Sequence, residues 1–395
     1  MNLSHAPIDA QEFSLAARIE EQWRLARTAR RLVVKIGSNL LTGGGQGVRG
    51  RWLDDCCGEI AGLMDVGKQV VVVTSGAVAA GTPRLGLGRR PNCLREKQAA
   101  AAAGQGVLMR WYEESLESRG RHPAQVLLTR EDVQHRRGYL NARDTLVTLL
   151  ELGLVPVINE NDTVAVEELK FGDNDTLAAL VAGLIDAELL ILLTDVDGLF
   201  NADPRHHAGA SVLPLVEHVT PEVEALAGGV GSAVGSGGMR TKLKAARKAA
   251  RYGCRTILAD GFADHPLRRV MDPALPPAGT LFMAEPGDPI SHRKRWIANG
   301  LVSEGTLLLD EGAALALRAG KSLLSKGVRG VEGAFERGAV VYCRAPDGRA
   351  VAKGMVNFAA SQALRIMGRH SHEIESLLGF ASDEEMIHRD NLVLL

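Results

Sequence analysis

A dense set of ionisable side chains lies at residues 159–175. Six carboxylates fall within this segment, interleaved with asparagines and Lys170, and apolar runs at 154–158 and 177–185 flank it. A polar segment anchored at both ends is typical of the rim of a site that holds a small charged molecule. Taken alone, the segment favours a solvated acidic loop, so its companions must decide between the two.

A lysine, Lys35, is embedded in the apolar run 32–36. A lysine in a buried strand is costly unless its charge meets an anion, so we expect Lys35 to act on a ligand. A second apolar run, 70–74, ends in Ser75 and Gly76. Small residues at this position let backbone amides approach an anion, although a tight turn into a helix explains them as well.

The glycine- and serine-rich segment 231–242 precedes a long predicted helix and ends in Lys242. The unpaired N–H groups of a helix N-terminus attract anions, so this segment predicts a phosphate site. It matches neither the P-loop nor the dinucleotide fingerprint, and a merely flexible loop is the alternative. Two lysines, glycine loops and carboxylates together suit phosphoryl transfer, which needs positioning and positive charge rather than a covalent nucleophile.

The elements that carry these motifs follow an α/β pattern. From residue 31 onward, short apolar runs alternate with helix-length segments, as expected for a mostly parallel sheet flanked by helices. Ligands bind beyond the carboxyl ends of such strands, so the motifs should meet at one edge of the sheet. The predicted strands are 32–36, 70–74, 124–129, 154–158, 188–194 and 256–260. The predicted helices are 51–66, 95–119, 138–152, 175–187 and 241–252.

The length of 395 residues predicts more than one domain. Six prolines between 266 and 289 indicate a linker, and short strands with close turns follow it. The turn Pro346-Asp347-Gly348 predicts a hairpin within this β-rich part. The predicted division is an N-terminal extension (1–30), an α/β domain (31–265), a linker (266–298), a β-rich domain (299–381) and a tail (382–395).

Composition excludes several classes of protein. A net charge of −1 gives no general attraction to nucleic acid or anionic membranes. The five cysteines lack C-x-x-C spacing, which argues against a disulfide framework or a zinc site and for a reducing compartment. The N-terminus lacks a signal pattern, and the longest apolar stretch contains Asp186 and Glu188 near its middle. We therefore expect a cytoplasmic protein without a membrane segment.

A set of motifs in register resembles the glutamate 5-kinases of the amino acid kinase family: VVKIGSN, VVVVTSGAVAAG, VPVINENDTV, FGDNDTLAALVA, LLTDVDGLFNADPR and GGMRTKLKAA. The resemblance covers 31–265, and the C-terminal part resembles the PUA domain of bacterial members. It implies the amino acid kinase fold and ATP-dependent phosphorylation of the L-glutamate γ-carboxylate, the first step of proline biosynthesis. No general base is needed, because a carboxylate with a pKa of about 4.3 is already ionised at neutral pH.

The resemblance also implies roles for individual residues. Lys35 and Lys242 would flank the transferred phosphoryl group, with Asp175 holding both lysines and the Gly76 amide facing the anion. The residues implied for glutamate are Ser75, Asp162, Asn174, Asn159, Asp173 and Lys170, with Asp162 suited to the α-ammonium. The residues implied for ATP are Lys35, Thr194, Asp195, Ser236, Gly237, Gly238, Met239, Arg240, Thr241 and Lys242. Magnesium (Mg2+) would be held largely by ATP phosphates and water, without a dedicated protein site.

Partners and control are implied as well. The resemblance implies feedback inhibition by proline at a site overlapping that of glutamate, a homo-oligomer (dimer or tetramer), and γ-glutamyl phosphate reductase as the recipient of the product. Kinases of the same fold that act on acetylglutamate, aspartate or a nucleotide are rivals, and the carboxylates around Asp162 favour a free ammonium. PUA domains elsewhere bind RNA, but residues 296–380 hold ten basic and eight acidic side chains, too little net charge to predict RNA binding.

Overall fold

The computed structural model divides the chain into two compact units. One comprises Met1–Asp132 and Asn141–Pro286, and the other comprises Gly287–Leu395 with Val133–Leu140. Within the described residues, none of the helices combines the length and apolar character needed to span a membrane. The structure describes residues 10–43, 48–87, 89, 91–129, 132–133, 136–164, 173–227, 238–285, 297, 303–379 and 384–395.

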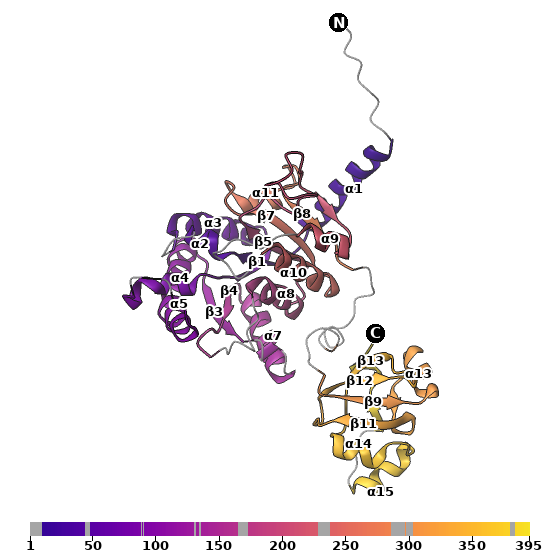
Figure 1. Ribbon diagram of the computed structural model, residues 1–395. Coiled ribbons are helices and arrows are strands. Elements are labelled where there is room, and N and C mark those ends of the chain that lie inside the picture. The colour runs from indigo at the N-terminus through magenta and orange to yellow at the C-terminus, as the bar shows by residue number, and fades with distance from the viewer. Residues whose placement is uncertain are drawn as a thin grey trace. The chain divides into compact units, whose positions relative to one another are not determined.

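An eight-stranded sheet forms the centre of the first unit (Figure 1), with the strand order β3-β4-β2-β1-β5-β7-β8-β6. Neighbouring strands are parallel except β7 and β8, which pair antiparallel. The predicted mostly parallel sheet is thereby confirmed. The strands are β1 (Arg31–Ile36), β2 (Gln69–Val73), β3 (Pro123–Leu128), β4 (Val155–Glu160), β5 (Leu189–Thr194), β6 (Leu215–Val216), β7 (Arg255–Asp260) and β8 (Thr280–Phe282).

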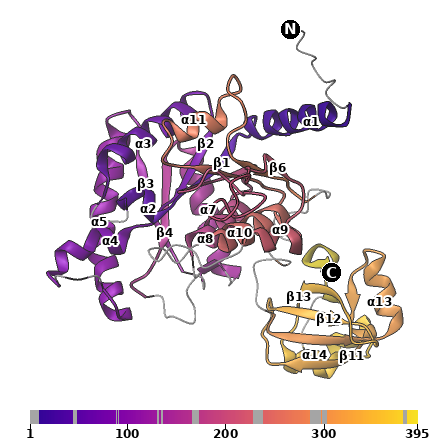
Figure 2. The same cartoon turned by 45° about the horizontal axis from the view of Figure 1, so that its top comes forward.

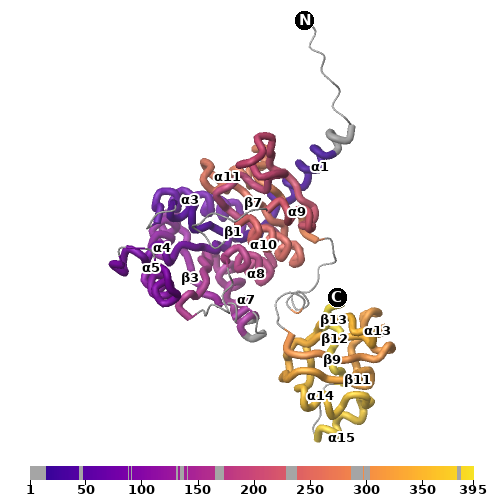
Figure 3. Tube along the Cα trace, in the orientation of Figure 1, coloured from indigo at the N-terminus to yellow at the C-terminus, as the bar shows by residue number. Residues whose placement is uncertain are grey.

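Helices cover both faces of this sheet (Figure 2). On one face α3 (Gly50–Asp65) contacts both α5 (Leu94–Glu117) and α11 (Pro266–Met271). On the other face α8 (Asn174–Leu184) and α10 (Met239–Arg251), far apart in the sequence, lie side by side (Figure 3). The remaining helices of this unit are α1 (Ala10–Arg27), α2 (Ser38–Thr42), α4 (Ala77–Gly81), α9 (Pro221–Leu226) and, from Asn141 onward, α7 (Arg136–Glu151).

Side chains along β1 alternate between the two faces of the sheet, so apolar core residues lie on one face and Lys35 lies on the other. Leu32, Val34 and Ile36 join the core cluster that includes residues of α3 and α5. The residue between the last two, Lys35, must point to the opposite face of the sheet. That is the face covered by α8 and α10, and both helices supply partners for the Lys35 site.

The segment after residue 265 corrects the predicted linker, because α11 and β8 belong to the first unit. Pro266 stands in the first turn of α11, where a missing backbone N–H costs nothing. β8 then pairs with β7 and covers what would otherwise be an open sheet edge. Among the described prolines of this segment, Pro266 begins α11 and Pro273 lies in the turn after it.

Helix α1 packs against the rest of the first unit through its C-terminal half. Trp23 is fully buried and its Nε1 donates a hydrogen bond to the Pro214 carbonyl at 3.0 Å. Arg27 Nε donates to the Val270 carbonyl at 3.0 Å. The predicted N-terminal extension therefore contains a helix that is tied to the segments around β6 and α11.

The second unit contains a five-stranded sheet in the order β11-β9-β12-β13-β15 and a two-stranded sheet of β10 and β14. The predicted hairpin joins β12 and β13, with Gly348 at a φ of 82°. The predicted tail is corrected, since β14 and β15 lie in it and pair with β10 and β13. The elements are β9 (Gly305–Leu309), α13 (Glu311–Arg318), β10 (Leu323–Leu324), β11 (Val328–Gly333), β12 (Val340–Arg344), β13 (Ala350–Met355), α14 (Ala360–Ile366), α15 (Ile374–Leu378), β14 (Glu385–Ile387) and β15 (Leu392–Leu394).

Candidate active site

A buried carboxylate, Asp175, joins the two lysines singled out in the sequence. Lys35 Nζ lies 2.6 Å from its Oδ1, and Lys242 Nζ lies 3.3 Å from its Oδ2. The Thr241 hydroxyl donates to Oδ2 at 2.8 Å. These side chains come from β1, α8 and α10, so three remote segments meet at this carboxylate.

The electrostatics of this cluster favour an anionic ligand. Burial alone would raise the pKa of the Asp175 carboxyl, but the charges of Lys35 and Lys242 outweigh it and hold that pKa at about 2. Both lysines are more than nine-tenths buried, and both form ion pairs with the same carboxylate, Asp175. Two buried cations at one carboxylate favour a further anion such as a phosphoryl group.

The N-terminus of α8 positions Asp175. Asp173 caps the helix, because its Oδ1 accepts a hydrogen bond from the Thr176 amide at 2.6 Å. Burial raises the pKa of the Asp173 carboxyl. Asp175 follows in the first turn, where the helix dipole stabilises a carboxylate. The predicted glutamate ligand Asp173 thus has a structural role in this state.

A second polar cluster surrounds Asn174, the residue before Asp175. Its Nδ2 lies within hydrogen-bonding distance of the Thr74 carbonyl (2.7 Å), Ser75 Oγ (2.9 Å) and Asn159 Oδ1 (3.0 Å). Asn159, only 2% exposed, donates from Nδ2 to Gln105 Oε1 at 2.9 Å. Three predicted glutamate ligands, Ser75, Asn159 and Asn174, are therefore brought together at the ends of β2 and β4 and the start of α8.

Gln105 was not anticipated from the sequence. It is the one polar side chain in the Ala/Gly run 99–106, and that contrast is a signal that could have found it. Close packing of α4 on α5 brings it into place. A Cβ at Gly81 would lie 1.8 Å from the Ala100 carbonyl oxygen, and one at Gly104 would lie 1.9 Å from that of Ala77. Only glycine fits at these two positions.

The carboxyl end of β5 forms a further part of the edge. Thr194 Oγ1 lies 3.1 Å from Asp195 Oδ1, and Asn39 Nδ2 donates to Asp195 Oδ2 at 3.0 Å. Burial opposes ionisation here, but the hydrogen bonds from Asn39 and Thr194 prevail and lower the pKa of the Asp195 carboxyl. Asn39 is a second residue that sequence reasoning did not place in the site.

The other predicted residues are distributed as follows. Gly76 opens α4 with a φ of 91°, a conformation that favours glycine. Asp162 lies in the turn after β4 and is partly exposed. Lys170, Ser236 and Gly237 lie outside the described residues, whereas Gly238 caps α10 and Met239 and Arg240 open it. Within the described ranges, no three His, Cys, Asp or Glu side chains group closely enough to hold a metal ion.

Comparison with known proteins decides the family. The sequence profile of the amino acid kinase family matches residues 30–260. The chain belongs to the amino acid kinase family. A PUA domain profile matches residues 305–378 of this kinase, so its β-rich part is a PUA domain. As a member of this family the protein is an enzyme, a kinase that uses ATP.

Individual relatives of this amino acid kinase agree with that result. The glutamate 5-kinase of Stutzerimonas stutzeri (strain A1501) is 51% identical over 372 residues, covering 93% of this chain and 98% of that protein. The glutamate 5-kinase of Azoarcus sp. (strain BH72) is 49% identical over 368 residues, with the same coverage of 93% and 98%. A solved structure of T. acidophilum isopentenyl phosphate kinase is 18% identical and covers 64% of this chain and 99% of its own, with a TM-score of 0.46. The family profile and the two glutamate 5-kinase relatives confirm the resemblance predicted from the sequence motifs.

Proposed function

We propose that this kinase transfers the γ-phosphoryl group of ATP to the γ-carboxylate of L-glutamate, the first step of proline biosynthesis. One observation carries the proposal. The consecutive residues Asn174 and Asp175 belong to two adjoining clusters, one of amides and hydroxyls and one of buried cations. Such an edge suits an acceptor anchored by polar groups beside a phosphoryl group held by lysines. The relatives named glutamate 5-kinase support this choice of acceptor.

The reaction needs no general base. A γ-carboxylate oxygen forms the new bond to the γ-phosphorus while the bond to the bridging oxygen of ATP breaks, and ADP leaves. The barrier is repulsion between anions, which cations relieve. Lys35 and Lys242 would flank the transferring group, Asp175 would hold both ammonium groups in position, and the Gly76 amide would face the developing charge.

Glutamate would lie against the amide cluster. Ser75, Asn159 and Asn174 offer hydroxyl and amide groups, with Lys170 and Asp173 nearby in the same motif. Asp162 would bind the α-ammonium, and this role favours glutamate over an acetylated acceptor, which lacks the positive charge. Proline would inhibit by occupying a site that overlaps this one.

ATP would lie along the ends of β5 and α10, bound by Thr194, Asp195 and residues 236–242. Mg2+ fits best on the nucleotide itself, because Lys35, Lys242 and Thr241 already engage both oxygens of Asp175. When bound, the ion would neutralise charge on the phosphates.

The resemblance to glutamate 5-kinases also supports proposals about the domains, the oligomeric state and the partner of this enzyme. Residues 31–265, together with the elements up to β8, would form the catalytic domain, and 299–381 would form the PUA domain. The enzyme would act in the cytoplasm as a homo-oligomer, a dimer or tetramer. It would pass its labile acyl phosphate to γ-glutamyl phosphate reductase.

The deciding experiment is ATP turnover with hydroxylamine present to trap acyl phosphates. Glutamate, aspartate, N-acetylglutamate and UMP are offered as separate acceptors. We expect hydroxamate from glutamate alone, suppressed by added proline. Preferential turnover of another acceptor would refute glutamate as the substrate but leave the proposed role of the lysine cluster in place. Glutamate turnover that added proline does not reduce would refute the feedback proposal.

A further inference from the structure

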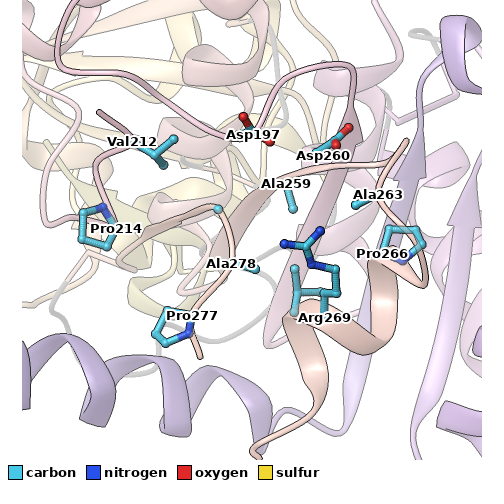
Figure 4. Close-up of a pocket in the computed structure, with 12 residues that line it drawn as sticks. Asp197, Val212, Pro214, Ala259, Asp260, Ala263, Pro266, Arg269, Pro277 and Ala278 are labelled. Atoms are coloured by element: carbon cyan, nitrogen blue, oxygen red, sulfur yellow. The ribbon is translucent and has the colours of Figure 1, made fainter. Parts of the chain in front are cut away.

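A pocket of about 360 Å³ lies within the first unit (Figure 4). Its walls come from the β5–β6 connection, the carboxyl end of β7, α11 and the approach to β8. None of the residues that line it belongs to the lysine cluster or to the amide cluster. The residues that line the pocket include three charged ones, Asp197, Asp260 and Arg269, and three apolar ones, Pro214, Val270 and Pro277.

Opposite charges face this pocket without neutralising each other. Figure 4 shows the Arg269 guanidinium directed from α11 into the pocket, with the carboxylates of Asp197 and Asp260 across from it. Within the described residues, the side chains of Arg269 and Asp197 form no ion pair or hydrogen bond. Asp260 uses one oxygen, Oδ1, to accept from the Phe262 amide at 2.8 Å. The space between these charges is open to a ligand.

Helix α1 fixes the apolar wall from behind. Trp23 Nε1 donates to the Pro214 carbonyl, and Arg27 Nε donates to the Val270 carbonyl, each at 3.0 Å. A second Arg27 nitrogen donates to the carbonyl of Pro276, the neighbour of Pro277, at 3.3 Å. Three of the lining residues, Pro214, Pro266 and Pro277, are prolines with restricted backbones. A wall held in this way is formed before a ligand arrives, and that lowers the entropic cost of binding.

We propose that this pocket is a second small-molecule site and that it takes a free α-amino acid with an apolar side chain. The amino acid carboxylate meets Arg269, its ammonium meets Asp197 and Asp260, and its side chain packs against Pro214, Val270 and Pro277. A simple anion would face two carboxylates and only one cation. Arg269 and Asp197 are exposed and Asp260 is half-buried, so the three charges select a ligand by complementarity rather than by the cost of burial. A simple amine would leave Arg269 without a role, and an apolar molecule would use none of the three charges.

The site is separate from the reaction site but adjacent to its nucleotide side. Asp260 is the register partner of Thr194, and the Gly261 amide donates to the Thr194 carbonyl at 2.7 Å. Asp197 follows Asp195 by two residues. The ligand would therefore bind beside the segment proposed to hold ATP, without contacting Lys35, Asp175 or Lys242.

The test is isothermal titration of the full-length protein, without nucleotide, against L-valine, L-leucine and L-proline. Isovalerate and isobutylamine are valine analogues that lack the ammonium and the carboxylate respectively. We expect at least one amino acid to bind, Arg269→Gln and Asp197→Asn each to weaken binding about tenfold, and both analogues to bind at least about tenfold more weakly than valine. Arg268→Gln, the exposed neighbour on the same helix and not part of the pocket, is the matched control and should bind as the wild type does.

Binding at the reaction site is distinguished with Asn174→Ala. Retention of amino acid affinity in this variant, together with its loss in Arg269→Gln, would support the proposal. Loss in Asn174→Ala with retention in Arg269→Gln would overturn it and place the amino acid in the reaction site. The proposal also fails if no amino acid binds, or if isovalerate binds as tightly as valine. None of these readouts depends on the acceptor specificity of the kinase.

Discussion

Lys35 Nζ lies 2.6 Å from Asp175 Oδ1, and both side chains are buried. The lysine is on the central strand β1, and the carboxylate is in the first turn of α8. Removing a charged partner from a buried pair costs stability, whereas a pair kept intact holds its charges in a fixed place. The proposed phosphoryl site therefore rests in part on a central strand and on a capped helix.

Replacing Lys242 by alanine should reduce turnover by roughly 10²–10³-fold without unfolding the protein. The fold survives because Asp175 keeps Lys35 and Thr241 as partners. Steady-state kinetics and thermal unfolding measure the two effects. Lys244→Ala, on the exposed side of the same helix, should leave both unchanged. Near-normal turnover in a folded Lys242→Ala variant would place the phosphoryl site elsewhere.

The contribution of Asp175 to stability should depend on pH. Its pKa is about 2 in the folded protein against an ordinary value of 3.8, so the stabilisation is complete above that ordinary value and is lost as the pH falls towards 2. The difference in unfolding free energy between wild type and Asp175→Asn should therefore shrink by about 2 kcal/mol between pH 5 and pH 2. Urea denaturation at several pH values measures it. A difference that does not change with pH would show that the lysines do not hold this carboxylate ionised.

Asp162→Ala should mainly raise the KM for glutamate, by about tenfold or more, and leave kcat within a few-fold of wild type. The reason is that Asp162 is proposed to bind the α-ammonium, which takes no part in the bond changes. Thr163→Ala, at the exposed next position, serves as the control. Initial-rate measurements over a range of glutamate concentrations decide the matter. An unchanged KM would move the ammonium site away from the β4 turn.

Two glycines of α5 should respond in opposite directions to alanine. Gly104→Ala places a Cβ 1.9 Å from the Ala77 carbonyl oxygen, so we expect a loss of about 2–3 kcal/mol in unfolding free energy. A Cβ at Gly106 meets no atom within 4 Å, so Gly106→Ala should gain about 0.5–1 kcal/mol from helix propensity. Denaturant unfolding of both variants measures these changes. Equal effects at the two positions would mean that α4 and α5 are not in backbone contact.

The sequence alone determined the fold class and predicted where the chemistry lies. Nearly continuous apolar runs such as 32–36 are typical of strands in a sheet that is covered on both faces. This pattern can be recognised from neighbouring residues alone. A lysine within such a run predicts a ligand because an unpaired buried charge is costly, and this argument needs only neighbouring residues. The motif order then identified the family.

Tertiary structure decided which residues meet. Six carboxylates in 159–175 are equivalent by composition, and only the packing of α8 against β1 and α10 makes Asp175 the shared partner of both lysines. Gln105 and Asn39 enter the site through hydrogen bonds to residues far along the chain. The strands β8 and β15 likewise form because sheet edges accept remote partners. Such pairings depend on which surfaces come into contact in the folded protein. The periodicity of apolar residues along the chain does not predict those contacts.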